Sequence, residues 1–137
     1  MTKFYKIIAA LLLLFNGTGA IYGGWNLIIH PDGSSIQLSP MWLEHTPFHS
    51  YLIPGIILFF ANGMLSIFVF ITILLNRKTY PFGVMAQGVI LTGWIVIQML
   101  LVQTVYFLHI VMGSTGLLLI LIGWLMKKKI NTQTATN

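Results

Sequence analysis

The residues with the most capacity for chemistry gather in one short segment, HPDGSSIQLSPMWLEHTPFH, at positions 30–49. It contains both acidic residues of the chain and three of the four histidines, and it has no lysine or arginine: the residues are Asp32, Glu44, His30, His45 and His49. Side chains of these types can bind a metal ion or transfer protons. The segment is therefore the first candidate for a metal site or a catalytic loop.

The spacing within this segment favours neither chemistry. His45 and His49 are four positions apart, which would place both on one face of a helix. Thr46-Pro47 is typical of a helix start, however, and a helix that begins there leaves His45 outside it. The sequence fixes no third ligand, so we predict no metal site, no cofactor and no catalytic residue.

The same segment carries turn and cap signals. Pro31-Asp32-Gly33-Ser34 predicts a turn, because proline presets φ, aspartate accepts from nearby amides and glycine takes positive φ. Ser39-Pro40 predicts the start of a short helix through MWLEH, whose Trp42 suits the head-group layer.

A second group of polar side chains lies inside apolar segments. Trp94 and Gln98 are on one helical face, and Gln98 and His109 lie close to the two ends of a very short link. If the flanking helices are antiparallel, Gln98 and His109 share one depth and Trp94 is a turn deeper. Asn16 and Asn62 each lie about ten residues into an apolar segment, near its middle.

Two interpretations of these five candidates remain open. Asn, Gln and His commonly tie membrane helices together by hydrogen bonds. Alternatively, the residues line a pocket that binds a lipid-like or quinone-like molecule, since a few polar groups on an apolar wall form such a site.

Composition excludes several other chemistries. The chain has no cysteine, which excludes thiol redox chemistry and iron–sulfur clusters. No Asp, Glu, Lys or Arg lies inside an apolar segment, whereas a proton-coupled exporter needs an intramembrane carboxylate. His109 is the only histidine within such a segment, which disfavours a haem held by two histidines across a bundle.

The elements that must position these residues are membrane helices. Of the 137 residues, 57% are hydrophobic and 7% are charged. Four apolar segments are long enough to span a bilayer, at about 7–29, 52–75, 82–102 and 104–126. Short links predict a single all-α domain over residues 1–130, an antiparallel four-helix bundle. Residues 131–137, NTQTATN, are predicted to be a disordered tail.

The first apolar segment also resembles a signal peptide, with Lys3 and Lys6 before it and small residues near Ala20. Because hydrophobicity resumes through residues 21–29, we expect an uncleaved anchor instead. A helix that begins near Pro47 is expected to bend at Pro54.

The positive charges predict the orientation. All seven Lys and Arg residues fall on the N-terminus, the link near 76–81 and the C-terminus, which four spans place on one side. The positive-inside rule makes that side cytoplasmic and leaves the loop at 30–51 external. We therefore predict a multi-pass protein of a bacterial-type inner membrane, in contact with lipids and not with nucleic acid.

Glycines predict where helices approach closely. Gly19 and Gly23 form a GxxxG pair, and Gly113 and Gly116 lie on one face of the fourth segment. Either face allows close packing within the bundle or against a protein partner or a second copy of the chain.

The strings PDGSSIQLS, TPFHSYLIPG and PFG followed by GWIVIQ resemble a group of small uncharacterised bacterial four-span membrane proteins. The group is expected to have an acid before YLIPG, where this chain has His49. The resemblance implies the four-span architecture and no activity. We predict a non-catalytic subunit or accessory module that holds a lipid-like ligand. The alternative is a small enzyme that uses the histidines on an amphipathic substrate at the outer leaflet.

Overall fold

The computed structural model describes residues 2–34, 47, 49–102 and 107–136, and within these ranges it is all-helical. The elements are α1 (Thr2–Ile29), α2 (Leu52–Ile57), the π-helix η3 (Leu58–Met64), α3 (Leu65–Leu74), α4 (Tyr80–Val102) and α5 (Phe107–Thr136). Since α2, η3 and α3 follow one another without a break, they form one span. Together the described residues supply four helices that are long and apolar enough to cross a membrane. The predicted four-span fold is confirmed.

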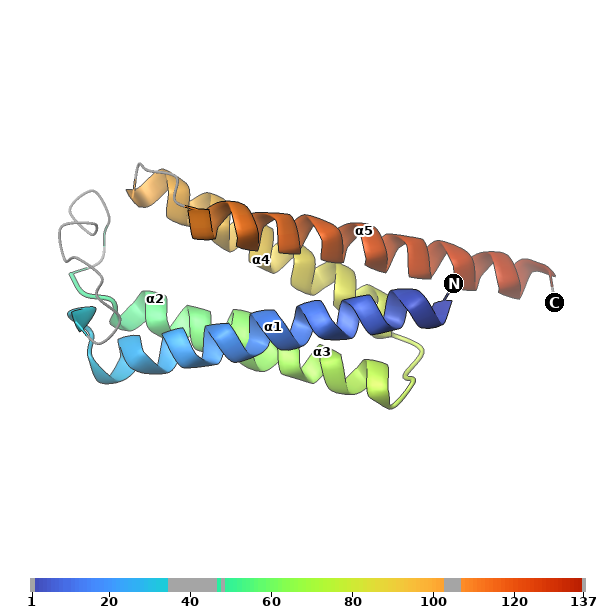
Figure 1. The fold of residues 1–137 in the computed structure, drawn as a ribbon, viewed down its shortest axis with the longest axis horizontal. Helices are drawn as coiled ribbons and strands as arrows, with labels where there is room; N and C mark the ends of the chain where they lie inside the picture. The colour runs from blue at the N-terminus through green and yellow to red at the C-terminus, as the bar shows by residue number, and fades with distance from the viewer. Residues whose placement is uncertain (1, 35–46, 48, 103–106, 137) are drawn as a thin grey trace.

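The four spans are arranged as two hairpins (Figure 1). In the first, α1 packs against α2, η3 and α3, and in the second α4 packs against α5. The hairpins touch through α1 with α5 and through α3 with α4, and they diverge away from the end that holds the termini. We call the end with the termini the basic end, because the lysines and the arginine lie there.

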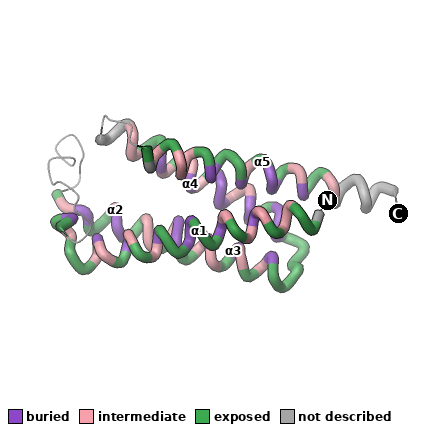
Figure 2. The backbone as a smooth tube through the Cα atoms, viewed as in Figure 1, coloured by how far each residue is buried: buried purple, intermediate pink, exposed green. Residues whose placement is uncertain are grey.

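The shared core of the two hairpins lies toward the basic end. It joins buried residues from α1, α3, α4 and α5: Ala9, Leu13, Val69, Ile73, Tyr80, Val84, Leu119, Ile122 and Met126. Exposed residues run along the outward sides of all the helices (Figure 2), and many are large and apolar. Such surfaces suit a lipid environment, because a bundle in a membrane keeps apolar residues outside as well as inside.

Glycines bring the helix backbones together inside each hairpin. A Cβ on Gly24 would lie 2.7 Å from the Phe59 amide nitrogen and 2.8 Å from the Gly55 carbonyl oxygen. In the second hairpin, a Cβ on Gly88 would lie 2.7 Å from the Gly116 carbonyl oxygen. Both interfaces therefore depend on the absence of a side chain at these positions.

Within the bundle only one of the two predicted glycine faces is closely packed, and contact of either face with a protein partner or a second copy stays a prediction. A Cβ on Gly19 would meet no described atom within 4 Å, and one on Gly23 would meet only Leu58, at 3.4 Å. The close approach of α1 is at Gly24 instead, because that residue faces α2 and η3 directly. On α5, Gly116 is buried against α4 as expected, and a Cβ on Gly113 would lie 3.7 Å from Ile95.

Helix boundaries differ from the predicted ones at two places. The second span begins at Leu52 and not near Pro47, because the Tyr51 amide donates to the Pro31 carbonyl oxygen at 2.7 Å and is held by the preceding turn. Residues 131–136 were expected to be disordered but continue α5. Extending an existing helix adds one backbone hydrogen bond for each residue that is fixed, so a polar tail can follow it.

The turn after α1 has the predicted geometry. Gly33 has a φ of 81°, and the Ser34 amide donates to Asp32 Oδ1 at 3.0 Å. Hydrogen bonds from Ser34 lower the pKa of the Asp32 carboxyl, with His30 adding a smaller effect. The predicted short helix at 39–45 lies outside the described residues.

Candidate functional site

Four buried polar residues lie where the two hairpins join, near the middle of the bundle. Asn16 comes from α1, Asn62 from η3, Ser66 from α3 and Gln87 from α4, and all four are buried. We call them the amide cluster. Asn16 is the fifteenth of the 28 residues of α1, so the cluster lies close to the middle of that helix. In a bilayer this position is remote from water at either surface.

Direct hydrogen bonds join three of the four spans at this point. The Asn16 amide group donates to Ser66 Oγ at 2.7 Å and to the backbone carbonyl oxygen of Asn62 at 3.2 Å. Gln87 Nε2 donates to the backbone carbonyl oxygen of Ala61 at 3.3 Å. The cluster therefore links α1 and α4 to the same short stretch of the second span.

That stretch is the π-helix, and its geometry makes the contacts available. At its end the Leu65 amide bonds to the Phe60 carbonyl oxygen, five residues back instead of four. The wider turn loosens the backbone ladder, so the carbonyl oxygens of Ala61 and Asn62 can accept from side chains of other helices. Single π turns inside α-helices often occur at functional sites.

The hydrogen bonding of the cluster is incomplete. Four buried atoms have no partner in the described part of the chain: Asn16 Oδ1, Asn62 Oδ1, Asn62 Nδ2 and Gln87 Oε1. A buried polar atom without a partner costs about 1–3 kcal/mol, and native proteins retain few of them. These four atoms keep unused hydrogen-bonding capacity, and three of the four are acceptors.

The cluster is suited to binding and not to acid–base chemistry. Amide and hydroxyl side chains do not titrate near neutral pH, so none of its four members can serve as a general acid or base there. Among residues 2–34, 47, 49–102 and 107–136, no group of three His, Cys, Asp or Glu side chains could hold a metal ion. Hydrogen bonding is the chemistry that these residues offer.

The five predicted site residues fall into two sets. Asn16 and Asn62 come together in the cluster, as their similar depths suggested. Trp94 and Gln98 lie further along α4, His109 lies near the start of α5, and all three are half-buried. That they share a pocket stays a prediction. His30 and His49 are exposed near the start of α2, whereas Glu44 and His45 lie outside the described residues.

Two members of the cluster are not among the predicted site residues. Ser66 is one helical turn from Asn62, and that spacing is the signal that could identify it. Gln87 shares a helical face with Leu91, Trp94 and Gln98, and its depth within the span is the corresponding signal. The π-helix itself has no signal in the apolar sequence LFFANGM.

No family model, no curated protein and no solved structure matches the chain.

Proposed function

We propose that the protein is a non-catalytic membrane module, an accessory protein or a subunit, that binds one amphipathic, lipid-like molecule at the amide cluster. The observation that carries the proposal is the set of four unpaired polar atoms at the middle of the bundle. In a bilayer no water is at hand to satisfy them, so leaving them empty costs more than in a soluble protein. A polar group on a bound molecule would remove that cost.

The balance of donors and acceptors narrows the ligand class. Among the unpaired atoms of the cluster in the described residues, three are acceptors, on Asn16, Asn62 and Gln87, and one is a donor, Asn62 Nδ2. A ligand group that mainly donates fits this set better than a carbonyl, which only accepts. The favoured ligand is therefore a hydroxyl-bearing lipid or a quinol, in preference to an oxidised quinone.

The arrangement of the hairpins differs on the two sides of the cluster. The shared apolar core fills the region between the cluster and the basic end. Toward the opposite end the backbones of the two hairpins lie further apart (Figure 1). Half-buried Trp94 and Gln98 lie on α4 in that direction.

Replacing Asn62 by leucine tests the proposal. Neither polar atom of its side chain is bonded in the structure, and leucine is similar in size. If the residue only fills space, Asn62→Leu should leave thermal stability unchanged or raise it, because no polar group is then left unpaired. If it contacts a ligand, the folded variant should lose the molecule that copurifies with the wild-type protein.

The measurement is native mass spectrometry of protein purified in mild detergent, followed by identification of the extracted lipid. Thr115→Val is the matched control, since it removes another buried polar group, a hydroxyl that donates to the Val111 carbonyl oxygen of its own helix outside the cluster. Wild-type protein without a stoichiometric bound molecule, or Asn62→Leu with an undiminished amount, would overturn ligand binding. The cluster would then serve only to join the hairpins.

We also propose that the basic end faces the cytoplasm of a bacterial-type inner membrane, so that the turn at Pro31–Ser34 is external. The segregation of Lys and Arg supports this orientation. The chain has no cysteine, so single labels can be introduced without background. Ser34→Cys should react with a membrane-impermeant thiol reagent in intact cells, and Arg77→Cys should react only after lysis. The reverse labelling pattern would show that the protein has the opposite orientation in the membrane.

A further inference from the structure

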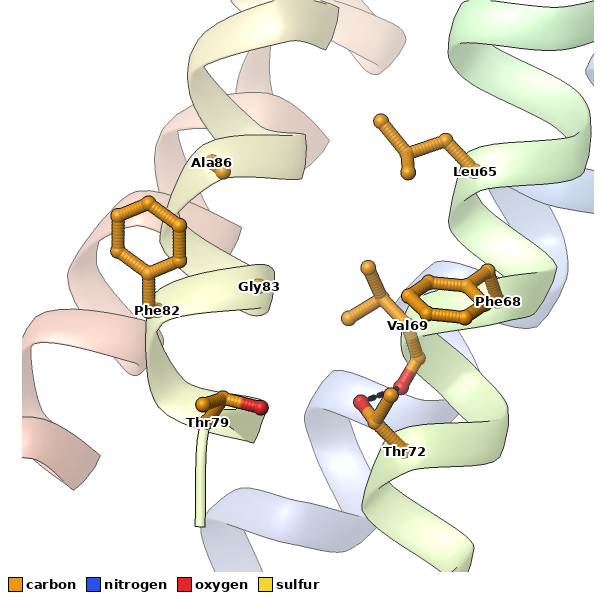
Figure 3. A pocket seen from close by; sticks show the side chains of 8 residues that line it. All are labelled: Leu65, Phe68, Val69, Thr72, Thr79, Phe82, Gly83 and Ala86. Atoms are coloured by element: carbon orange, nitrogen blue, oxygen red, sulfur yellow. Dashed lines mark hydrogen bonds between the residues drawn. The ribbon is translucent and has the colours of Figure 1, made fainter. Parts of the chain in front are cut away.

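An apolar groove runs between α3 and α4 on the half of the molecule toward the basic end (Figure 3). Six of the residues that line it are apolar: Leu65, Phe68, Val69, Phe82, Gly83 and Ala86. Its volume of about 210 Å³ is below the range of about 300–1,000 Å³ that is usual for enclosed ligand pockets. The groove is thus suited to hold part of an elongated molecule that remains partly in the bilayer.

The walls of the groove lie open to the membrane. Phe68 and Phe82 flank it and are 62% and 68% exposed. Across the floor, a Cβ on Gly83 would lie 3.3 Å from Val69, so α3 and α4 approach most closely there. The hydroxyls of Thr72 and Thr79 lie at the end nearest the loop that joins the two helices (Figure 3).

That loop places two positive charges at the same end of the groove. Asn76 has a φ of 56° and ends α3, with its amide bonded to the Ile73 carbonyl oxygen at 3.0 Å. The Arg77 amide bonds to the Thr72 carbonyl oxygen at 3.0 Å, which completes a Schellman motif. Arg77 is therefore bonded through its backbone to Thr72, and Lys78 directly precedes Thr79, so both lie next to residues that line this end of the groove, and both are exposed.

No acidic side chain in the described part of the chain lies near these two charges. Asp32 follows the end of α1 that is away from the basic end, and Glu44, the other acidic residue, lies outside the described residues. Lys6, by contrast, has structural contacts: its Nζ donates to Asn76 Oδ1 at 2.6 Å and lies 4.9 Å from the centre of the Tyr80 ring. Of the charges next to the α3–α4 loop, Arg77 and Lys78, rather than Lys6, are thus available to an external anion.

We propose that the groove seats one acyl chain of an anionic diacyl phospholipid, whose phosphate group lies at Arg77 and Lys78. The lipid belongs to the leaflet at the basic end. An apolar channel that ends at two unpaired cations matches the two chemical parts of such a lipid, and basic sites beside membrane helices bind anionic head groups. The site requires only that the helices span a bilayer. It does not depend on the amide cluster.

Titration of delipidated protein in detergent with phosphatidylglycerol or phosphatidylcholine, followed by native mass spectrometry, tests the proposal. Wild-type protein should bind one phosphatidylglycerol in preference to phosphatidylcholine. The double variant Arg77→Gln/Lys78→Gln should bind phosphatidylglycerol about 30-fold more weakly, as expected for two surface cations, with phosphatidylcholine unchanged. Ala86→Phe should weaken the binding of both lipids, because the added ring fills the groove.

Two further variants make the result specific. Lys127→Gln/Lys129→Gln removes the same charge from the basic end of α5, away from the groove, and should bind phosphatidylglycerol like the wild type. Phe68→Ala removes an exposed wall at little risk to folding and should also weaken both lipids. Equal binding of the two lipids, the same loss in the Lys127/Lys129 variant, or wild-type binding by both Ala86→Phe and Phe68→Ala would overturn the proposal.

Discussion

The interface inside the second hairpin and the junction between the hairpins are built from different kinds of residue. Between α4 and α5, Gly88, Gly116 and Gly123 let backbone meet backbone, and a Cβ at any of them would lie within about 3 Å of the facing helix. Between the hairpins, the middle of the bundle is filled by amide side chains that are only partly bonded to one another.

The two regions differ in whether close packing of the helices accounts for the residues found there. Without a hydrophobic force between helices in lipid, close glycine contacts stabilise a pair through van der Waals packing. The α4/α5 interface is explained in these terms, except for one buried hydroxyl, on Thr92, that has no partner in the described residues. The junction keeps three buried acceptors without donors in the same part of the chain, a cost that packing alone would not impose. The proposal is therefore a structural role for the first region and ligand binding for the second, and this contrast can be tested.

The largest effect is expected from Gly116→Leu. A Cβ on Gly116 would lie 3.0 Å from the Thr92 amide nitrogen and 3.1 Å from the Gly88 carbonyl oxygen, so a leucine must push α4 and α5 apart. We expect a loss of roughly 3 kcal/mol or more, because backbone atoms cannot yield as flexible side chains do.

Gly93→Leu is the control on the facing helix. A Cβ there would have no described atom within 4 Å, and leucine has the higher helix propensity, so stability should hold or rise. Thermal unfolding in detergent measures both variants. A Gly116→Leu protein as stable as the wild type would show that the α4/α5 interface does not depend on glycine.

A smaller effect is expected from Gln87→Leu. The change removes the donor to the Ala61 carbonyl oxygen and leaves a backbone acceptor of the π-helix unpaired. The cost should be about 1–2 kcal/mol, as for other hydrogen bonds between membrane helices. Gln98→Leu, on the same helix but half-buried and outside the cluster, should cost less than this or nothing. Equal losses would mean that Gln87 is not specifically tied to the junction.

The sequence predicts the fold well because the bilayer restricts the possibilities. Four apolar segments joined by short links leave little choice beyond an antiparallel bundle, and the Pro31–Ser34 turn follows from local backbone preferences. The close approach at Gly24 could not be predicted in the same way. Gly19, Gly23 and Gly24 have the same local properties, and only the rotation of α1 against its neighbour decides which one is buried.

The sequence predicts two of the four residues of the amide cluster, Asn16 and Asn62, as site residues. Regular helix rise predicts similar depths for Asn16 and Asn62, and the Asn16 side chain bonds to the Asn62 carbonyl oxygen; a role of the two residues in ligand binding stays a prediction. Gln87 lies near Asn16 and Asn62 only because the two hairpins contact each other at that level, and this contact depends on the tertiary arrangement of the helices. The π-helix depends on one extra residue within a turn, and neither propensity nor apolar periodicity encodes it in LFFANGM.

The smallest effect, and the sharpest test of the contrast, is expected from Thr92→Val. Thr92 Oγ1 is buried without a partner in the described part of the chain, yet it lies against Gly116 inside the α4/α5 interface and not at the junction. Valine keeps the shape and removes the unpaired hydroxyl, so we expect a change of about 0–1 kcal/mol in the stabilising direction. Any molecule that copurifies should be retained, since this atom belongs to the packed region. If Thr92→Val lost the bound molecule while Asn62→Leu kept it, the site would lie within the second hairpin, and the roles of the two regions would be reversed.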